Sequence, residues 1–136
     1  MTYSPPPQPG YGAGPAVPPQ VNTAAILLFV GGGFGILGGV VLLALGSLGA
    51  FFALVGLLFL VVGGLEIWLG IALRRLKPWA RTAAIILAGI GGAFSLISLA
   101  KGSYPSVISL ALDTLIIYLL MQAPVVQAFA DSNRMP

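Results

Sequence analysis

Residues 24–65 contain no Asp, Glu, Lys or Arg, and this uncharged stretch of 42 residues constrains the fold more than any other feature. A helix needs about 20 apolar residues to cross the hydrocarbon core of a bilayer, so the stretch is long enough for two spans joined by a turn. Charged residues make up only 7% of the whole chain, against about 25% in soluble domains. The sequence therefore predicts an integral membrane protein.

Turn signals divide the apolar sequence into four expected spans. Gly46-Ser47-Leu48-Gly49 is the turn signal inside the uncharged stretch. Pro78 and Pro105 suit the first turn of a helix, where a missing N–H costs little. We expect the spans at about residues 23–45, 49–73, 79–100 and 105–122. The predicted fold class is all-α, a four-helix transmembrane bundle with a disordered Pro-rich N-terminal tail.

Residues 1–22 are rich in proline and glycine and contain little to bury. We expect them to form a disordered cytoplasmic tail with polyproline II character, followed by Asn22 or Thr23 as the cap of the first helix. The spacings Pro6–Pro9 and Pro15–Pro18 are compatible with docking to a proline-binding partner, but we favour a solvated tail. Because the tail has no basic residues, it does not match a signal peptide, and the first span is expected to remain as an anchor.

Residues 124–136 are expected to form a short cytoplasmic tail, because Pro124 interrupts the fourth span. Within this tail, Val125–Phe129 has the pattern of a short amphipathic turn at the membrane interface. We therefore expect the end of the chain to touch the bilayer surface without crossing the membrane.

The basic residues are concentrated in the loop between the second and third expected spans, whereas the next loop contains only Lys101. Cytoplasmic loops of membrane proteins carry the excess of Lys and Arg, and aromatic residues mark the interface. The residues expected at the cytoplasmic interface are Arg74, Arg75, Lys77, Trp79 and Arg81. With four spans, both termini are then cytoplasmic, and we expect the protein in the plasma membrane.

Glycines recur at intervals of seven residues through the first two expected spans. They are Gly32, Gly39 and Gly46 in the first span and Gly49, Gly56, Gly63 and Gly70 in the second. Because seven residues bring a helix almost back to the same face, each series forms a groove where a neighbouring backbone approaches closely. We favour packing of these two spans against each other as a glycine zipper. A seam between copies of the chain is the alternative.

Glu66 and Asp113 are the acidic residues inside the expected spans. A charge near the bilayer centre costs about 2.5–3.5 kcal/mol on insertion scales, so such side chains usually face protein or water. Glu66 lies eight residues before Arg74 and Asp113 lies nine residues before Gln122. At a rise of about 1.5 Å per residue, both carboxyl groups are expected at a similar depth. Ser109 lies one turn before Asp113 and adds a polar group to its face.

We consider three interpretations of these two acids. In the first, which we favour, they are structural: they are protonated, hydrogen-bonded across helices or paired with a base, and Arg81 at the start of the third span is within reach of Glu66. In the second, they share a cation or a proton, because two nearby carboxylates repel each other when both are charged. In the third, each acid contacts a polar residue of another membrane subunit.

The sequence contains no Cys and no His, which excludes disulfides, thiolate or imidazole catalysis and the common zinc ligands. It also lacks a phosphate-binding loop, a dinucleotide fingerprint and a Ser/His/Asp set. We therefore expect no enzymatic activity, no cofactor and no metal. The net charge of +3 is too small to indicate nucleic acid. The lipid bilayer is the expected partner, with self-association or other membrane subunits as further options.

Residues 23–28, Thr-Ala-Ala-Ile-Leu-Leu, resemble residues 82–87, Thr-Ala-Ala-Ile-Ile-Leu. At the same offset of 59 residues, Gly32 aligns with Gly91. The similarity suggests a duplicated helical hairpin, as in some transporter folds. The alternative is chance, because membrane helices use few residue types.

The whole chain resembles small actinobacterial four-span integral membrane proteins of unknown function. The resemblance is carried by the tail Tyr3–Gly12, the end of the basic loop at Lys77–Arg81 and the last span around Leu112–Leu120. It implies a plasma-membrane location and supplies no activity. The small four-span drug exporters match poorly, because their essential Glu lies in the first span and residues 23–45 contain no acid.

These observations lead to an interpretation of function by exclusion. We interpret the chain as a non-enzymatic accessory or scaffolding membrane protein that acts through helix–helix contacts. The alternative is a small oligomeric transporter or channel, coupled to protons or cations, that uses Glu66 and Asp113.

Overall fold

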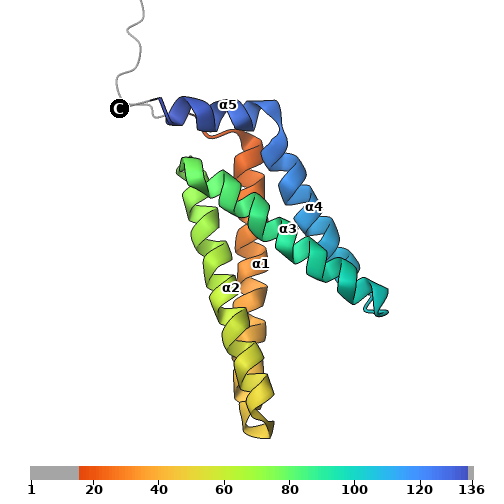
Figure 1. Ribbon diagram of the computed structural model, residues 1–136. Coiled ribbons are helices and arrows are strands. Elements are labelled where there is room, and N and C mark those ends of the chain that lie inside the picture. The colour runs from red at the N-terminus through yellow and green to blue at the C-terminus, as the bar shows by residue number, and fades with distance from the viewer. Residues whose placement is uncertain (1–15, 135–136) are drawn as a thin grey trace, which may run out of the picture.

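The structure, a computed structural model, describes residues 16–134, and these residues form helices joined by short turns (Figure 1). The α-helices are α1 (Pro19–Ala44), α2 (Ala50–Arg74), α3 (Pro78–Ala100), α4 (Ser106–Met121) and α5 (Ala123–Ser132). A 3-10 turn, η1 (Leu45–Leu48), joins the first two. The described part of the chain contains no strand, so the all-α fold class is confirmed there.

Three of the helices are long and apolar enough to cross a membrane. They are α1 with η1, α2 and α3. Helix α4 has only 16 residues, about 24 Å at 1.5 Å per residue, whereas a bilayer core is about 30 Å thick. It counts as a fourth span when it is taken together with α5, from which it is bent by 61°. The described residues therefore provide three to four spans of a membrane protein.

The start of α1 differs from the sequence-based prediction. The helix begins at Pro19, four residues before Thr23, and Pro18 is its cap. The prediction of Asn22 or Thr23 as the cap is wrong, because a proline at the first helical position has no N–H that needs a partner. Thr23 instead donates its hydroxyl hydrogen to the carbonyl oxygen of Pro19 at 3.0 Å. The predicted disorder of the tail concerns mainly residues 1–15, which lie outside the described residues.

The C-terminal end is more ordered than a short tail. The expected turn at Val125–Phe129 is part of the ten-residue helix α5, with Pro124 in its first turn. Val125 and Phe129 are buried, because they lie four residues apart on one face of α5. Helix α5 is therefore amphipathic, and its apolar face packs on the bundle.

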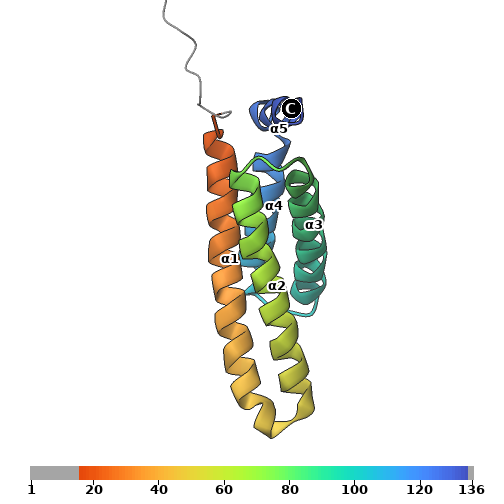
Figure 2. The same ribbon diagram turned by 90° about the vertical axis from the view of Figure 1, so that its left-hand side faces the viewer.

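The helices form two antiparallel hairpins that meet at one end. Helices α1 and α2 make the first hairpin and α3 and α4 the second, while α1 contacts α4 and α2 contacts α3. Figures 1 and 2 show α5 lying across the end of the bundle where α1 begins. Away from α5, the two hairpins diverge (Figure 1). We call this diverging part the open half of the bundle.

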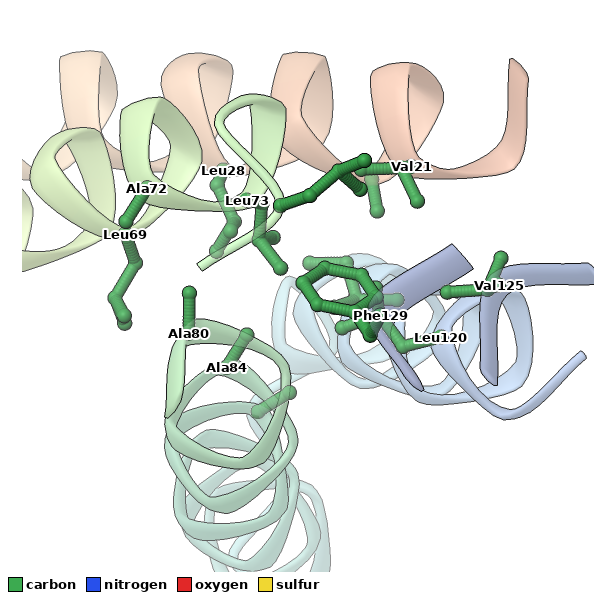
Figure 3. Packing of buried hydrophobic residues seen from close by; sticks show 14 residues of the cluster. Val21, Leu28, Leu69, Ala72, Leu73, Ala80, Ala84, Leu120, Val125 and Phe129 are labelled. Atoms are coloured by element: carbon green, nitrogen blue, oxygen red, sulfur yellow. The ribbon is translucent and has the colours of Figure 1, made fainter. Parts of the chain in front are cut away.

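The apolar core lies at the end that α5 covers. Figure 3 shows the ring of Phe129 among the side chains of Leu73 and Leu120, close to the first turns of α1. The large side chains that are almost completely buried are Leu73, Leu120, Val21 and Val125. Since each comes from a different helix, the core joins α1, α2, α4 and α5 at this end.

The turn after α2 has an unusual backbone. Helix α2 ends in a Schellman motif, in which Lys77 N–H donates to the Ala72 carbonyl and Leu76 N–H donates to the Leu73 carbonyl. Leu76 has a φ of 50°, a left-handed conformation that costs a residue other than glycine about 1–2 kcal/mol. Its side chain is buried, and its carbonyl oxygen accepts a hydrogen bond of 3.0 Å from Ser132 Oγ. Contacts with the core and α5 therefore hold this turn.

Candidate functional site

The backbones of α1 and α2 touch at two pairs of glycines. A β-carbon on Gly32 would lie 2.6 Å from the carbonyl oxygen of Gly63, and one on Gly63 would lie 2.7 Å from the carbonyl oxygen of Gly32. Gly39 and Gly56 have the same reciprocal relationship at 2.8 Å. Real β-carbons essentially never approach other atoms this closely. Glycine is thus required at these four positions for the observed helix separation.

The other three glycines of the series lie in different surroundings. At Gly70, a β-carbon would meet the ring of Phe29 at 2.6 Å. Gly46 lies in the 3-10 turn, where a β-carbon would lie 3.0 Å from that of Ala53. At Gly49, the residue before α2, a β-carbon would meet no atom within 4 Å. The reciprocal backbone contacts therefore lie between Gly32 and Gly39 on α1, whereas Gly46 and Gly70 lie closest to side chains of the neighbouring helix.

Glu66 on α2 lies against the backbone of α1. A β-carbon on Gly31 would lie 2.9 Å from Oε2 of Glu66, and one on Gly32 would lie 3.2 Å from the β-carbon of Glu66. The absence of side chains at these two glycines leaves the space that the Glu66 carboxyl group occupies. Glu66 is half-buried and points toward the neighbouring helix.

Asp113 on α4 has the same relationship to α3. A β-carbon on Gly91 would lie 2.9 Å from Oδ2 of Asp113, and one on Gly92 would lie 3.8 Å from the β-carbon of Asp113. Asp113 is also half-buried. In each hairpin, an acid on the second helix therefore packs on a Gly-Gly pair of the first helix.

The two acid–glycine contacts are also related to each other. The carboxyl groups of Glu66 and Asp113 have the same relationship to their own hairpins, although they come from helices that are not neighbours in either hairpin. Neither carboxyl group makes a hydrogen bond to another side chain or to the backbone of residues 16–134. In hydrocarbon such a group requires a proton, a water molecule or a polar partner. This arrangement is the candidate functional site.

Arg81 does not bond to Glu66 in this structure. Its Nε donates a hydrogen bond of 2.9 Å to the carbonyl oxygen of Leu120, near the end of α4. In a continuous helix that carbonyl would accept the N–H of residue 124, but Pro124 has none. Arg81 thus supplies the hydrogen bond that this carbonyl oxygen would otherwise lack. Its positive charge also interacts favourably with the dipole at the C-terminal end of α4.

Ser109 lies one turn before Asp113 on the same side of α4, and its side chain is exposed. Ile116, on the other side of Asp113, is buried. This face of α4 is therefore covered near α5 and uncovered in the open half. Ser109 does not join the two acids in a bonded cluster.

The basic end of the bundle also carries an aromatic pair. Arg74, Arg75 and Lys77 are exposed around the α2–α3 turn. The rings of Trp68 and Trp79 pack with centroids 4.7 Å apart. Indole rings concentrate at membrane–water interfaces, so this end has the composition expected for an interface. Among residues 16–134, no three His, Cys, Asp or Glu side chains lie together in a way that could hold a metal ion.

A family model described as "Domain of unknown function (DUF7144)" matches residues 20–124, which is most of the chain. The chain belongs to the DUF7144 family. No match was found among curated proteins or solved structures. The DUF7144 region contains α1 to α4 and both acid–glycine contacts. It ends at Pro124, so most of α5 lies outside it.

Sequence reasoning did not identify Gly31 and Gly91 as the contacts of the two acids in this DUF7144 domain. The glycine that contacts each acid lies on the preceding helix of the same hairpin. The internal similarity contained a signal, because an offset of 59 residues aligns Gly32 with Gly91. In the structure, the glycines in contact with the two acids are Gly31 and Gly91, which are 60 residues apart. The sequence similarity, with its offset of 59, therefore predicts the position of the second glycine to within one residue.

Proposed function

We propose that the chain is a four-span plasma-membrane protein with both termini in the cytoplasm, acting without catalysis as an accessory or scaffolding subunit. It acts by binding another membrane segment through helix–helix contacts. The observation that carries this proposal is that Glu66 and Asp113 are half-buried and make no side-chain hydrogen bond within residues 16–134. A polar side chain of a partner helix would satisfy them.

The surface of α4 supports a binding position in the open half. Asp113 and Ser109 share a face, yet only the part near α5 is covered by other helices. A helix seated against Ser109 would extend the covered face and bring polar groups to Asp113. Val107 lies on the opposite side of α4 and is 49% exposed, so it serves as a reference position that faces lipid.

Photo-crosslinking in intact cells tests this proposal. A photo-reactive amino acid at position 109 is expected to yield one discrete adduct with a membrane protein, and the same residue at position 107 is expected to yield lipid adducts only. Asp113→Asn should weaken the adduct at position 109. Equal protein adducts at both positions, or none at position 109, would contradict a specific partner.

The second candidate function is a small proton- or cation-coupled transporter or channel. It is favoured by the two half-buried carboxyl groups of Glu66 and Asp113, which make no side-chain hydrogen bond within residues 16–134, because an unsatisfied acid inside a membrane is suited to hold a proton or a cation. In liposomes, this function requires a coupled flux that Glu66→Gln and Asp113→Asn each abolish while the protein remains folded. A wild-type protein without flux would exclude this candidate.

The orientation is tested with single cysteines, because the chain contains none. A cysteine replacing Lys77 should react with a membrane-impermeant maleimide only after the cytoplasmic side is opened. A cysteine replacing Lys101 should react from outside intact cells. The reverse labelling pattern would show that the topology is inverted. Labelling of both cysteines from the same side would show that the chain crosses the membrane fewer than four times.

A further inference from the structure

A hollow lies between the start of α1 and the end of α2. It has a volume of about 480 Å³ and is lined by Val17, Pro19, Asn22 and Arg74. Two of the lining residues, Val17 and Pro19, are apolar, and the other two, Asn22 and Arg74, have polar side chains with hydrogen-bond donors. Arg74 is the last residue of α2 and is exposed. The hollow is therefore amphipathic and contains one cation.

The polar side chains of this hollow carry several hydrogen-bond donors. Neither Asn22 nor Arg74 donates a side-chain hydrogen bond to any group within residues 16–134. An Arg guanidinium has five N–H donors in a planar arrangement that matches phosphate oxygens. The Asn22 amide adds two donors. The hollow thus provides donors for an anion and no carboxylate that would repel one.

The electrostatic surroundings favour an anion at this end. Its other basic residues are Arg75, Lys77, Arg81 and Arg134, and its acid is Asp131. The opposite end of the second hairpin carries only Lys101. Anionic lipids in the cytoplasmic leaflet attract basic segments beside membrane helices. The hollow lies within this positively charged end.

The position of the hollow along α2 corresponds to the headgroup level. Trp68, which packs on Trp79, lies six residues before Arg74 on the same helix. Six residues correspond to about 9 Å of helix, and indole rings lie at the boundary of the hydrocarbon core. If the Trp pair lies at this boundary, Arg74 extends into the layer that contains lipid phosphates.

We propose that this hollow binds the phosphate group of an anionic phospholipid. Arg74 and Asn22 donate to the phosphate oxygens, and Val17 and Pro19 contact the glycerol and the first acyl carbons. The inference requires only that the chain spans a bilayer. It does not depend on a partner subunit, so failure of the crosslinking experiment would leave it intact.

Native mass spectrometry of the purified full-length protein tests this proposal. The protein in detergent is titrated with phosphatidylglycerol and, separately, with phosphatidylcholine. We expect one phosphatidylglycerol to bind preferentially, and Arg74→Gln to weaken this binding about five- to tenfold. Asn22→Ala should weaken it less, because it removes neutral donors.

Arg75→Gln is the matched control, because it removes the same charge from the adjacent residue, which does not line the hollow. It should change phosphatidylglycerol affinity less than twofold. Equal losses for Arg74→Gln and Arg75→Gln would overturn the proposal in favour of diffuse attraction. Complete displacement of phosphatidylglycerol by inorganic phosphate or glycerol phosphate would also overturn it, because a soluble anion would then suffice. Folding of each variant is verified by its circular dichroism.

Discussion

The carboxyl group of Glu66 occupies space that a side chain at position 31 would fill, since a β-carbon on Gly31 would lie 2.9 Å from its Oε2. Asp113 has the same relationship to Gly91 at 2.9 Å. When an acidic side chain packs against the backbone of glycine residues, the neighbouring helix shields it from lipid, and no salt bridge is needed for this. Both hairpins use this arrangement.

The contact between Glu66 and Gly31 predicts coupling between the two positions. Gly31→Ala should lower the free energy of unfolding by about 1 kcal/mol, because the new methyl group displaces the carboxyl group. In a Glu66→Ala background, the same change should cost nothing or stabilise α1 slightly, since alanine favours helix. The double-mutant cycle is measured in bicelles by titration with SDS. Additive effects of the two substitutions would refute the coupling.

The second hairpin provides an independent prediction. Gly91→Ala should destabilise the protein in the wild-type background and have no effect with Asp113→Ala. Gly89→Ala is the matched control, because a β-carbon there meets no atom within 4 Å. Unfolding in bicelles again provides the measurement. A penalty at position 89 as large as that at position 91 would indicate a general cost of removing glycine from α3.

The contact of Gly32 with Gly63 predicts a larger effect of alanine on the first hairpin. Gly63→Ala should destabilise the protein by about 1–3 kcal/mol, because its methyl group meets a backbone carbonyl that cannot rotate away. Gly64→Ala should be neutral or stabilising by up to about 1 kcal/mol, since a β-carbon there meets no atom within 4 Å. Thermal denaturation of both variants in the same detergent distinguishes the two glycines. Similar melting temperatures would contradict the observed helix contact.

The hydrogen bond from Arg81 to Leu120 predicts a specific role for one of the basic residues. Arg81→Gln should lower the free energy of unfolding by about 1.5–3 kcal/mol, because a charged donor is lost from the end of α4. Arg81→Lys should lose less, since the positive charge still faces the helix terminus. Arg75→Gln, at an exposed position, should change stability by less than about 0.5 kcal/mol. Equal losses at positions 75 and 81 would show that net charge alone matters.

Most features that depend on local sequence could be predicted, and most details of the contacts between helices could not. The turn around Gly46–Gly49 and the helix start at Pro78 follow from residues that act on their own backbone. The start of α1 at Pro19 was missed because a proline-rich composition indicates disorder. A single proline, however, is well suited to the first turn of a helix. The length of α5 was missed because its burial comes from helices that are distant in sequence.

In the candidate site, too, some features could be predicted from the sequence and others could not. Hydropathy identified Glu66 and Asp113 as unusual, and helical rise placed them at similar depth. Their partners were not predictable, because the register between antiparallel helices depends on which glycines interlock. Arg81 was expected near Glu66 from its position in sequence. The missing N–H at Pro124 leaves a carbonyl at the end of α4 that Arg81 satisfies instead.

The left-handed conformation of Leu76 leads to a prediction that reverses the usual order of glycine and alanine. Both Leu76→Gly and Leu76→Ala lose a buried side chain, which costs about 2–5 kcal/mol. Alanine also keeps the strain of a φ of 50°, whereas glycine relieves about 1–2 kcal/mol of it. Leu76→Gly should therefore be the more stable variant. At Leu73, which is buried within α2, the glycine variant should instead be less stable by about 1 kcal/mol. Unfolding of the four variants in one detergent measures the reversal, and the same order at both positions would show that Leu76 is not strained.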